Sequence, residues 1–370
     1  MRILAIETSC DETACAVITD GTKVLSNVVA TSRTMHEKYG GIVPEVAARE
    51  QLQCIRPVIE EALSIFQQYD NRTIHQCIRE NIDAIAVTVG PGLIGSLLIG
   101  VETAKTIAFL TGKPIIPVNH VIAHMYASFV NDKQNDENNK VTIEFPAISL
   151  VVSGGHTELY LMKSVNDLTW LGGTLDDAAG ECFDKCARLL GFGHGGGAAI
   201  EAAASRHSGK RVSERVQNPN EMLDKTGMML PRPMLDESYN FSFSGLKTAV
   251  MREWEKKDAG RRTQDAGLGN AFSYEIQEAI TDVLVKKTLH AASQYNAKSI
   301  LLSGGVAANL RLREKLASTI KQWNNVTIAI PPVSLCTDNA VMVASCAYFR
   351  GAPADWHSIT AIPDLSVENV

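Results

Sequence analysis

His120 and His124 are the residue pair in this sequence whose types and spacing most directly indicate chemistry. They stand four positions apart in His120–Val130, whose apolar spacing predicts a helix, so both imidazoles would project from one face. A third ligand such as Asp338 would complete a site for Fe(II) or Zn(II) with open positions for a substrate oxygen. A solvent-facing or buried histidine pair, with Asp338 as a helix N-cap, explains the same pattern equally well.

The same pair disfavours one class of enzyme. Val121 stands where a zinc protease of the HExxH type carries its catalytic Glu. A metalloprotease is therefore not expected, whereas other metal-assisted reactions stay open.

Three polar turns each follow an apolar strand: Glu7–Thr13, Ser153–Thr157 and Ser303–Asn309. Their small residues let backbone N–H groups approach an anion, although most glycine turns simply reverse the chain. The third turn precedes a predicted helix, where a phosphate or a ribose could meet the helix N-terminus.

Acidic residues are spaced as one stripe along a predicted helix, at Asp177, Glu181 and Asp184. Such a stripe is either a solvated face or a set of carboxylates that holds ribose hydroxyls, and the residues alone leave both interpretations open. Basic residues gather at positions 210–215, 256–262 and 311–315. For each basic group, solvated surface is favoured over nucleic-acid contact.

The elements that must position these residues occur in the same order twice. In each half a β-hairpin is followed by helix, strand, Gly-rich turn, helix, strand and a final helix. This repeated order predicts an α/β fold of two similar lobes with a ligand cleft between them. The strands are predicted at 2–5, 14–18, 82–89 and 115–118, and again at 147–152, 158–162, 299–302 and 326–330.

The composition changes at a wholly polar run, Asn131–Lys140, which reads as a connector. The predicted boundaries are an N-terminal α/β lobe at 1–130, a connector at 131–146, a C-terminal α/β lobe at 147–350 with an irregular insert at 206–237, and a tail at 351–370.

Length and composition are those of an ordinary globular protein. The chain has 370 residues, of which 45% are hydrophobic and 21% charged, which argues against a disordered or fibrous protein. A net charge of −6 excludes an indiscriminate polyanion binder, although a local basic patch could serve a nucleic acid. The eight cysteines are too sparse for a disulfide scaffold. Without a recognisable secretory leader or a long uninterrupted apolar run, a cytoplasmic protein with no membrane segment is expected.

Nine short segments, in order, closely resemble the bacterial form of the tRNA N6-adenosine threonylcarbamoyltransferase family, once labelled O-sialoglycoprotein endopeptidases. The resemblance runs from about Met1 to Arg350. The segments are Ile6–Thr13 (IETSCDET), Gly40–Glu45, Gly90–Gly95, His120–His124, Val152–Thr157 (VSGGHT), Thr174–Lys185, Phe241–Thr248, Ser303–Asn309 and Cys336–Asn339 (CTDN).

The resemblance implies the two-lobed actin-like fold shared by sugar kinases and Hsp70-type ATPases. It implies transfer of threonylcarbamoyl from threonylcarbamoyl-AMP to N6 of adenosine 37, in the anticodon loop of tRNAs that read codons beginning with A. The implied partners are tRNA, a paralogous dimerising protein and a small ATPase. One divalent metal per subunit is implied, with Fe²⁺ favoured and Zn²⁺ as the alternative.

Carried over residue by residue, the resemblance assigns His120, His124 and Asp338 to the metal. Asp11 or Glu12 is the candidate for orienting the attacking amine or taking its proton. Asp184 and Glu201 would hold ribose hydroxyls, and Asn309 would lie by the adenine. The full set implied to bind the adenylate is Val151, Val152, Ser153, Gly154, Gly155, Asp184, Gly197, Glu201 and Asn309. Arg311 and Arg313 follow this set and are expected to contact tRNA.

The chain departs from the family pattern in places. His194–Ala198 replaces a loop that usually has two prolines, which is expected to loosen the nucleotide loop. Gln51 stands where a histidine is common, and Glu201 where Asp is frequent. The alternative function is an ATPase, or a small-molecule carbamoyl- or phosphotransferase, on the same fold. Such an enzyme would not need the histidine pair, and a non-enzymatic scaffold would tolerate loss of the metal.

Overall fold

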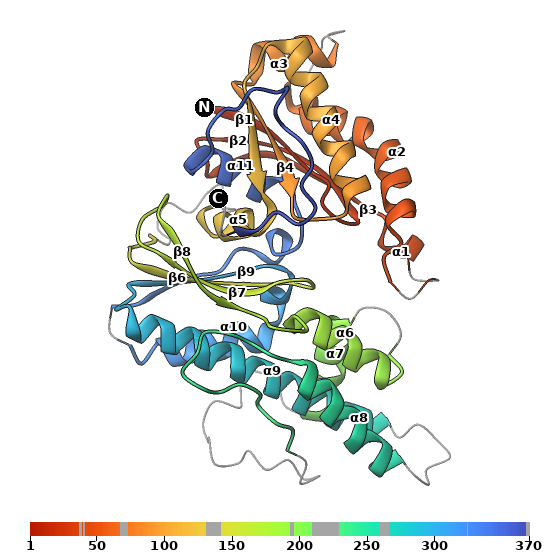
Figure 1. Ribbon diagram of the computed structural model, residues 1–370, viewed down its shortest axis with the longest axis vertical. Coiled ribbons are helices and arrows are strands. Elements are labelled where there is room, and N and C mark those ends of the chain that lie inside the picture. The colour runs from red at the N-terminus through yellow and green to blue at the C-terminus, as the bar shows by residue number, and fades with distance from the viewer. Residues whose placement is uncertain are drawn as a thin grey trace. The chain divides into compact units, whose positions relative to one another are not determined.

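The computed structural model describes residues 1–36, 39, 41–66, 73–130, 142–192, 196–208, 229–258, 266–323 and 325–367. The chain forms two compact units (Figure 1). Unit 1 comprises Met1–Thr142, Val165–Asp167 and Pro331–Val370, and unit 2 comprises Ile143–Ser164 and Leu168–Ile330. Most of the predicted connector, and positions 209–228 of the predicted insert, lie outside the described residues.

Unit 1 is built on a five-stranded mixed sheet with the order β3-β2-β1-β4-β5. The first three strands pair antiparallel, and β4 and β5 continue the sheet in parallel with β1. The residues of β1, β2 and β4 are almost all buried, which is why they read as continuous apolar runs. The strands are β1 (Arg2–Glu7), β2 (Glu12–Thr19), β3 (Lys23–Thr31), β4 (Ala84–Gly90) and β5 (Ile115–Asn119).

Two long helices of unit 1, α2 and α4, pack against each other and cover the sheet (Figure 1). Helix α4 ends at Gly112, whose φ of 70° is the left-handed conformation that glycine adopts easily. The helices are α1 (Arg33–His36), α2 (Pro44–Leu63), α3 (Ile74–Asn81), α4 (Ile94–Thr111), α5 (His120–Tyr126) and α11 (Ala340–Phe349), with short 3₁₀ turns η2 (Ser64–Phe66), η3 (Ala127–Phe129) and η8 (Val333–Leu335).

Helix α4 is long and apolar enough, by length and composition, to cross a membrane. Core helices of globular proteins share these properties. Here Leu97, Val101 and Ala104 are fully buried, and the helix packs on β4 and α2. We therefore describe α4 as a core helix of unit 1.

Helix α11 corrects one predicted boundary. Residues up to 350 were expected in the C-terminal lobe, but everything from Pro331 onward belongs to unit 1. The reason is apolar burial: α11 is buried along nearly its whole length and packs on α5, β1 and β2. Helix α11 thus completes the core of unit 1, to which β1 and β2 also belong.

Unit 2 carries a second five-stranded mixed sheet with the order β10-β9-β6-β7-β8. Strands β6, β7 and β8 pair antiparallel, and β9 and β10 extend the sheet in parallel with β6. The strands are β6 (Ala147–Val152), β7 (Thr157–Met162), β8 (Leu168–Gly173), β9 (Ser299–Ser303) and β10 (Thr327–Ala329). The helices are α6 (Ala179–Leu189), α7 (Gly196–Ser208), α8 (Ser244–Asp258), α9 (Ala266–Gln294) and α10 (Leu310–Ile320), with the 3₁₀ turn η7 (Gly305–Ala308).

The two sheets have the same topology. Read from its antiparallel edge, the second sheet runs β8-β7-β6-β9-β10, which matches β3-β2-β1-β4-β5 in both order and strand direction. The predicted α/β class is confirmed, and the duplicated topology is that of the actin-like, sugar-kinase and Hsp70-type ATPase fold. Each predicted hairpin is extended by one further antiparallel strand, β3 or β8, into a three-stranded meander. The sequence analysis did not predict these two strands.

Candidate metal centre and nucleotide site

The predicted metal ligands come together in unit 1. One ligand atom from each of His120, His124 and Asp338 lies within 4.8 Å of the others. Asp338 Oδ1 is 3.6 Å from His120 Nε2 and 3.3 Å from His124 Nε2. Both histidines are buried on the first turns of α5, which begins where the Asn119 side chain accepts hydrogen bonds from two backbone N–H groups.

His120, His124 and Asp338 fit a cation site better than they fit a histidine pair without a ligand and a helix N-cap, the alternatives raised by the sequence. Asp338 is not the cap of α11, because the Asn339 side chain takes that role by accepting a hydrogen bond from Met342 N–H. Within the described part of the chain, neither ring nitrogen of buried His124 makes a hydrogen bond, although Nε2 lies 3.3 Å from Asp338 Oδ1. A buried imidazole without hydrogen bonds is costly, and two imidazoles with one carboxylate are a ligand set for Fe(II) or Zn(II).

A buried carboxylate, Glu7, adjoins this cluster and was not predicted. Its Oε2 lies 3.2 Å from His120 Nδ1, and it also accepts hydrogen bonds from Ser9 N–H and Thr88 Oγ1. Burial alone would raise the pKa of Glu7, but neighbouring His120 outweighs it and lowers the pKa. Burial likewise opposes the charge on His120, yet the carboxylates of Asp338 and Glu7 raise its pKa to about 9.

Asp11, in the turn that leads into β2, directly precedes that strand, and Glu12 is its first residue, close enough to Asp338 for its carboxylate to act on Glu12. Burial, reinforced by the nearby carboxylates of Asp338 and Asp11, raises the pKa of Glu12 to about 10. Glu12 is therefore protonated at neutral pH in the metal-free chain, and it then offers a proton instead of accepting one.

Gln51, on α2, holds the backbone of this turn. Its fully buried Nε2 donates to the carbonyl oxygens of Cys10 and Glu12, both at 3.0 Å, and lies 3.4 Å from that of Thr8. Ser96 Oγ also donates to the Cys10 carbonyl at 3.1 Å. The departure from the family's histidine at position 51 thus supplies an amide that fixes the turn.

The residues implied to bind the adenylate all lie in unit 2, and several are brought together. Val151 and Val152 end β6, and Val152 lies against Gly304, where a Cβ would come within 2.4 Å of the Val152 carbonyl oxygen. The φ of Gly304, 91°, is a second reason that glycine is needed there. The turns after β6 and β9 therefore adjoin.

The β6–β7 turn offers fewer free donors than expected. Ser153 N–H donates to the His156 carbonyl, so it is not available to an anion. Gly154 and Gly155 are exposed, with open space where a Cβ would stand. Their backbone N–H groups donate no hydrogen bond to any residue that the structure describes. These two glycines are the part of the turn that can approach a ligand.

Glu201 and Asn309 both cap α10. A Glu201 carboxylate oxygen accepts from Leu310 N–H at 2.7 Å, and Asn309 Oδ1 accepts from Leu312 N–H at 3.0 Å. Asn309 Nδ2 donates to Gln277 Oε1 at 3.0 Å, which fixes the orientation of the amide. The sequence allowed a phosphate or a ribose at this helix N-terminus. A phosphate would meet the Glu201 carboxylate there, so a ribose hydroxyl or a base edge suits the position better.

The acidic stripe expected on one helix is not formed. Asp177 precedes α6, and it shares Lys185 with Glu181 through contacts of 2.6 and 2.8 Å. Asp184 lies apart from this pair, exposed beside the start of α7, where a Cβ on Gly196 would fall 1.4 Å from its Oδ1. Gly197 is in the same first turn of α7. Of the departing loop His194–Ala198, positions 194 and 195 lie outside the described residues.

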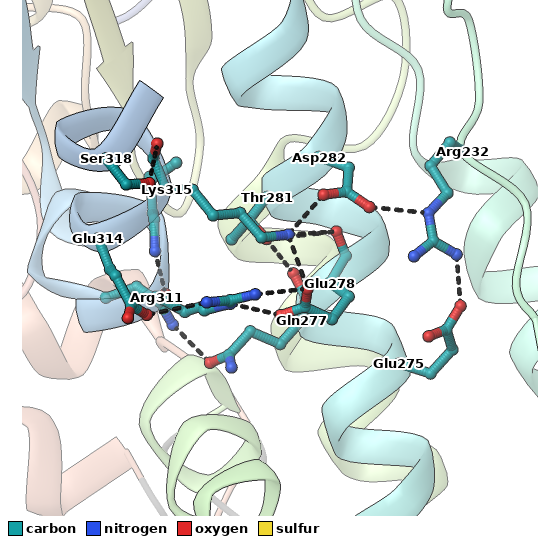
Figure 2. A network of polar contacts seen from close by, with 12 residues as sticks. Arg232, Glu275, Gln277, Glu278, Thr281, Asp282, Arg311, Glu314, Lys315 and Ser318 are labelled. Atoms are coloured by element: carbon teal, nitrogen blue, oxygen red, sulfur yellow. Dashed lines mark hydrogen bonds and ion pairs between the residues drawn. The ribbon is translucent and has the colours of Figure 1, made fainter. Parts of the chain in front are cut away.

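The two arginines expected to contact tRNA are engaged within unit 2. Figure 2 shows Arg311 extended from α10 toward α9, where Nε and Nη2 contact Glu278 at 2.6 and 3.0 Å; Nη1 contacts Glu314, also on α10, at 2.9 Å. Lys315 adds contacts to Glu278 and Asp282. Arg313 Nε donates to the Ala307 carbonyl. The charge of Arg311 is thus compensated inside the fold, and its expected contact with tRNA is not supported.

The duplicated sheets and the His–His–Asp cluster define an α/β protein of actin-like topology with a candidate metal centre. A family model for tRNA N6-adenosine threonylcarbamoyltransferase matches residues 23–345. The chain belongs to this family, and it is accordingly a transferase.

Curated relatives agree over nearly the whole length. The chain is 45% identical to the tRNA N6-adenosine threonylcarbamoyltransferase of Thermomicrobium roseum, with 96% of this chain and 94% of the relative covered. It is 43% identical to that of Dehalococcoides mccartyi, with 99% of each covered. Among solved structures, component A of (R)-2-hydroxyglutaryl-CoA dehydratase from Acidaminococcus fermentans aligns over 94% of this chain and 98% of its own, with 14% identity and a TM-score of 0.47.

Proposed function

We propose that this chain transfers the threonylcarbamoyl group of threonylcarbamoyl-AMP to N6 of adenosine 37, in tRNAs that read codons beginning with A. Family membership supports the reaction. The structural observation that carries the proposal is the cluster of the buried His120 and His124 with the half-buried Asp338, because a kinase or ATPase of the same fold has no need of it.

In this reaction a bond forms between N6 and the carbamoyl carbon, and the bond from that carbon to the phosphate oxygen breaks. AMP leaves with the electron pair, and N6 loses a proton. The exocyclic amine of adenine is a weak nucleophile, so a positioned carboxylate assists by orienting it or taking its proton. Asp11 is the first candidate, because Glu12 holds its own proton at neutral pH in the metal-free chain.

His120, His124 and Asp338 would hold one divalent cation, with Fe²⁺ favoured and Zn²⁺ as the alternative. When bound, the cation would polarise the activated carbamoyl group or its phosphate as a Lewis acid. The protein's share is to place two buried imidazoles and one half-buried carboxylate within reach of one another before the cation arrives, which limits the reorganisation that binding requires.

The adenylate would bind on unit 2. Gly154 and Gly155 would approach it with backbone N–H groups, and Asp184 would accept hydrogen bonds from ribose hydroxyls. Asn309 would present its remaining amide N–H to the adenine, since its oxygen caps α10 and its nitrogen is held by Gln277.

The tRNA would present adenosine 37 from an unpaired loop, so no duplex has to be melted. A chain with net charge −6 lacks general attraction for a polyanion, so binding would depend on local patches and on partner proteins. A paralogous dimerising protein and a small ATPase are the proposed partners, and the cytoplasm is the proposed compartment.

The paralogous partner would dock on the outer face of α2 and α4. Leu52, Ile94 and Leu98 are 64%, 50% and 41% exposed there. The helices approach closely beside them, since a Cβ on Gly95 would lie 3.2 Å from Ala48 Cβ. Leu52→Asp should abolish co-purification of the partner, whereas Phe109→Asp, at the far end of α4, should not. Equal loss in both variants would exclude this face.

The transfer itself is tested by mass spectrometry of tRNA nucleosides after the protein is depleted and then restored as wild type or as His124→Ala. Wild type should restore threonylcarbamoyladenosine and His124→Ala should not, although both fold. Restoration by His124→Ala would contradict the metal-assisted reaction. ATP turnover without tRNA would favour the phosphotransfer alternative.

A further inference from the structure

Glu7 ends β1 with its side chain fully buried beside the metal cluster. Oε1 accepts a hydrogen bond from Ser9 N–H at 2.5 Å. Oε2 accepts one from Thr88 Oγ1 at 2.5 Å and lies 3.2 Å from Nδ1 of His120. The carboxylate thus acts as an acceptor toward β4, toward its own turn and toward α5, and these contacts hold it in one position.

The contact with Glu7 decides which nitrogen of His120 carries a proton. Because an ionised carboxylate only accepts hydrogen bonds, the contact is a hydrogen bond in the tautomer that has its proton on Nδ1. Ser9 Oγ, 3.1 Å from the same nitrogen, can accept as well. Nε2 is the nitrogen on the other side of the ring, and it is turned toward Asp338, at 3.6 Å.

We propose that Glu7 is a positioning residue of the metal centre: it fixes the tautomer and the ring orientation of His120, so that Nε2 is presented to the cation. Carboxylates behind ligating histidines play this part in many metal sites, and their removal weakens metal binding. The inference rests on the proposed function only in treating the His–His–Asp cluster as a cation site.

The second histidine of the cluster is held differently. Among the described residues, no carboxylate or hydroxyl makes a hydrogen bond to His124 Nδ1, and Nε2 lies 3.3 Å from Asp338 Oδ1. The ring of His120 is thus held from behind by a carboxylate, whereas the ring of His124 is held by packing and by its contact with Asp338. A role for Glu7 in packing only, as a bridge from Ser9 to Thr88, would predict a loss of stability without a specific effect on the metal.

Titration of the full-length chain with Co²⁺ alone, followed by visible absorption and chelator competition, separates these roles. Glu7→Gln keeps the size and one acceptor but loses the charge, and it should bind Co²⁺ about 10–100-fold more weakly, with an altered absorption spectrum. Glu278→Gln is the matched control, since Glu278 is a carboxylate of similar burial in unit 2. It should lower stability and leave Co²⁺ affinity unchanged.

The outcomes are distinguishable. If wild type fails to bind Co²⁺, the cation site itself is wrong. If Glu7→Gln binds Co²⁺ within about twofold of wild type, only the positioning role is overturned. Should Glu7→Gln fail to fold, wild type loaded with Zn²⁺ and labelled with ¹⁵N-histidine supplies the answer, with His120→Gln to assign the signal. A proton on Nδ1 of His120 is expected, and metal bound through Nδ1 would refute the proposal.

Discussion

Arg311 grips the buried carboxylate of Glu278 with two nitrogens, Nε on Oε1 at 2.6 Å and Nη2 on Oε2 at 3.0 Å. This two-point contact joins α10 to α9 next to Gln277, which in turn holds Asn309 (Figure 2). An arginine committed in this way supports α9 beside Asn309, one of the residues proposed to bind the adenylate, and it is not available to a polyanion in solution.

Replacement of Arg311 should therefore cost stability. Arg311→Met leaves Glu278 buried with Lys315 as its remaining cation and is expected to lower the free energy of unfolding by about 3 kcal/mol. Urea denaturation measures this, with Arg56→Met as control. Arg56 forms an exposed pair with Glu60, whose loss should cost no more than about 1 kcal/mol. If Arg311→Met is as stable as wild type but no longer binds tRNA, Arg311 contacts tRNA after all.

The same pair makes stability depend on pH. Burial opposes the charge of Glu278, but Arg311 and Lys315 outweigh it and hold its pKa below 4.5. Its contribution is thus present above pH 4.5 and is lost as the pH falls through the lower folded-state pKa. The stability difference between wild type and Glu278→Gln should be largest at neutral pH and shrink in acid. Denaturation curves that differ equally at all pH values would contradict this.

Metal affinity should rise with pH. Burial opposes protonation of His120, yet Asp338 and Glu7 raise its pKa to about 9, so below this pH a cation must displace a proton. Co²⁺ affinity is expected to increase up to about tenfold per pH unit between about pH 6 and 8, with one proton released per ion. Calorimetry in buffers of different ionisation enthalpy measures the proton. Binding that is independent of pH would mean that His120 is not a ligand.

The metal-free chain should show the opposite trend. Because its pKa is raised from 6.5, His120 contributes stability that is fully present below pH 6.5 and is lost as the pH rises through about 9. Added Co²⁺ should therefore raise the melting temperature more at the alkaline end of this window.

Asp184 should be needed for the adenylate and not for the fold. Asp184→Ala leaves ribose hydroxyls unpaired and is expected to weaken adenylate binding by about 1–3 kcal/mol in calorimetry. Gly196→Ala should have a similar effect without removing the carboxylate, since the added Cβ would lie 1.4 Å from Asp184 Oδ1 and displace it. Glu181→Ala, on the same helix but paired with Lys185, is the control that should bind normally.

Gln51 should matter for catalysis more than for metal binding. Gln51→Leu removes the donor to the Cys10 and Glu12 carbonyls, which frees the turn that carries Asp11. Transfer should fall by at least about tenfold while Co²⁺ affinity stays within about twofold, because misplaced catalytic groups are costly to rate. Gln51→His, the residue common in the family, should retain activity if one donor suffices.

The sequence pointed to the three side chains that the fold brings together, because part of their signal is local. His120 and His124 share one helical turn, whereas Asp338, far along the chain, was assigned to the same site by the family resemblance. Glu7 was missed because its role depends on partners distant in sequence, Thr88 and His120. The available signal was that Glu7 is a charged residue at the end of the otherwise apolar run of β1.

The missed strands have a physical explanation as well. Residues of β3 alternate between partly buried and exposed positions, and it is an edge strand. Strand β8 ends in Gly172 and Gly173, which disfavour strands by propensity. Here Gly172 is required by a close approach, since a Cβ would lie 2.7 Å from the Tyr239 backbone. Edge strands depend on neighbours for their formation, and a single sequence does not show the neighbours.

The return of α11 to unit 1 has a consequence for how the protein is made. The ribosome delivers β1 and α5 early, but Asp338 and the apolar helix behind it arrive last. At typical synthesis rates, the roughly 200 residues between His124 and Asp338 take about 10–40 s to emerge. During that time the two histidines and the apolar surface that α11 will cover lie open. Unit 1 therefore cannot complete its core, or bring its three candidate ligands together, before the segment that begins at Pro331 has been synthesised.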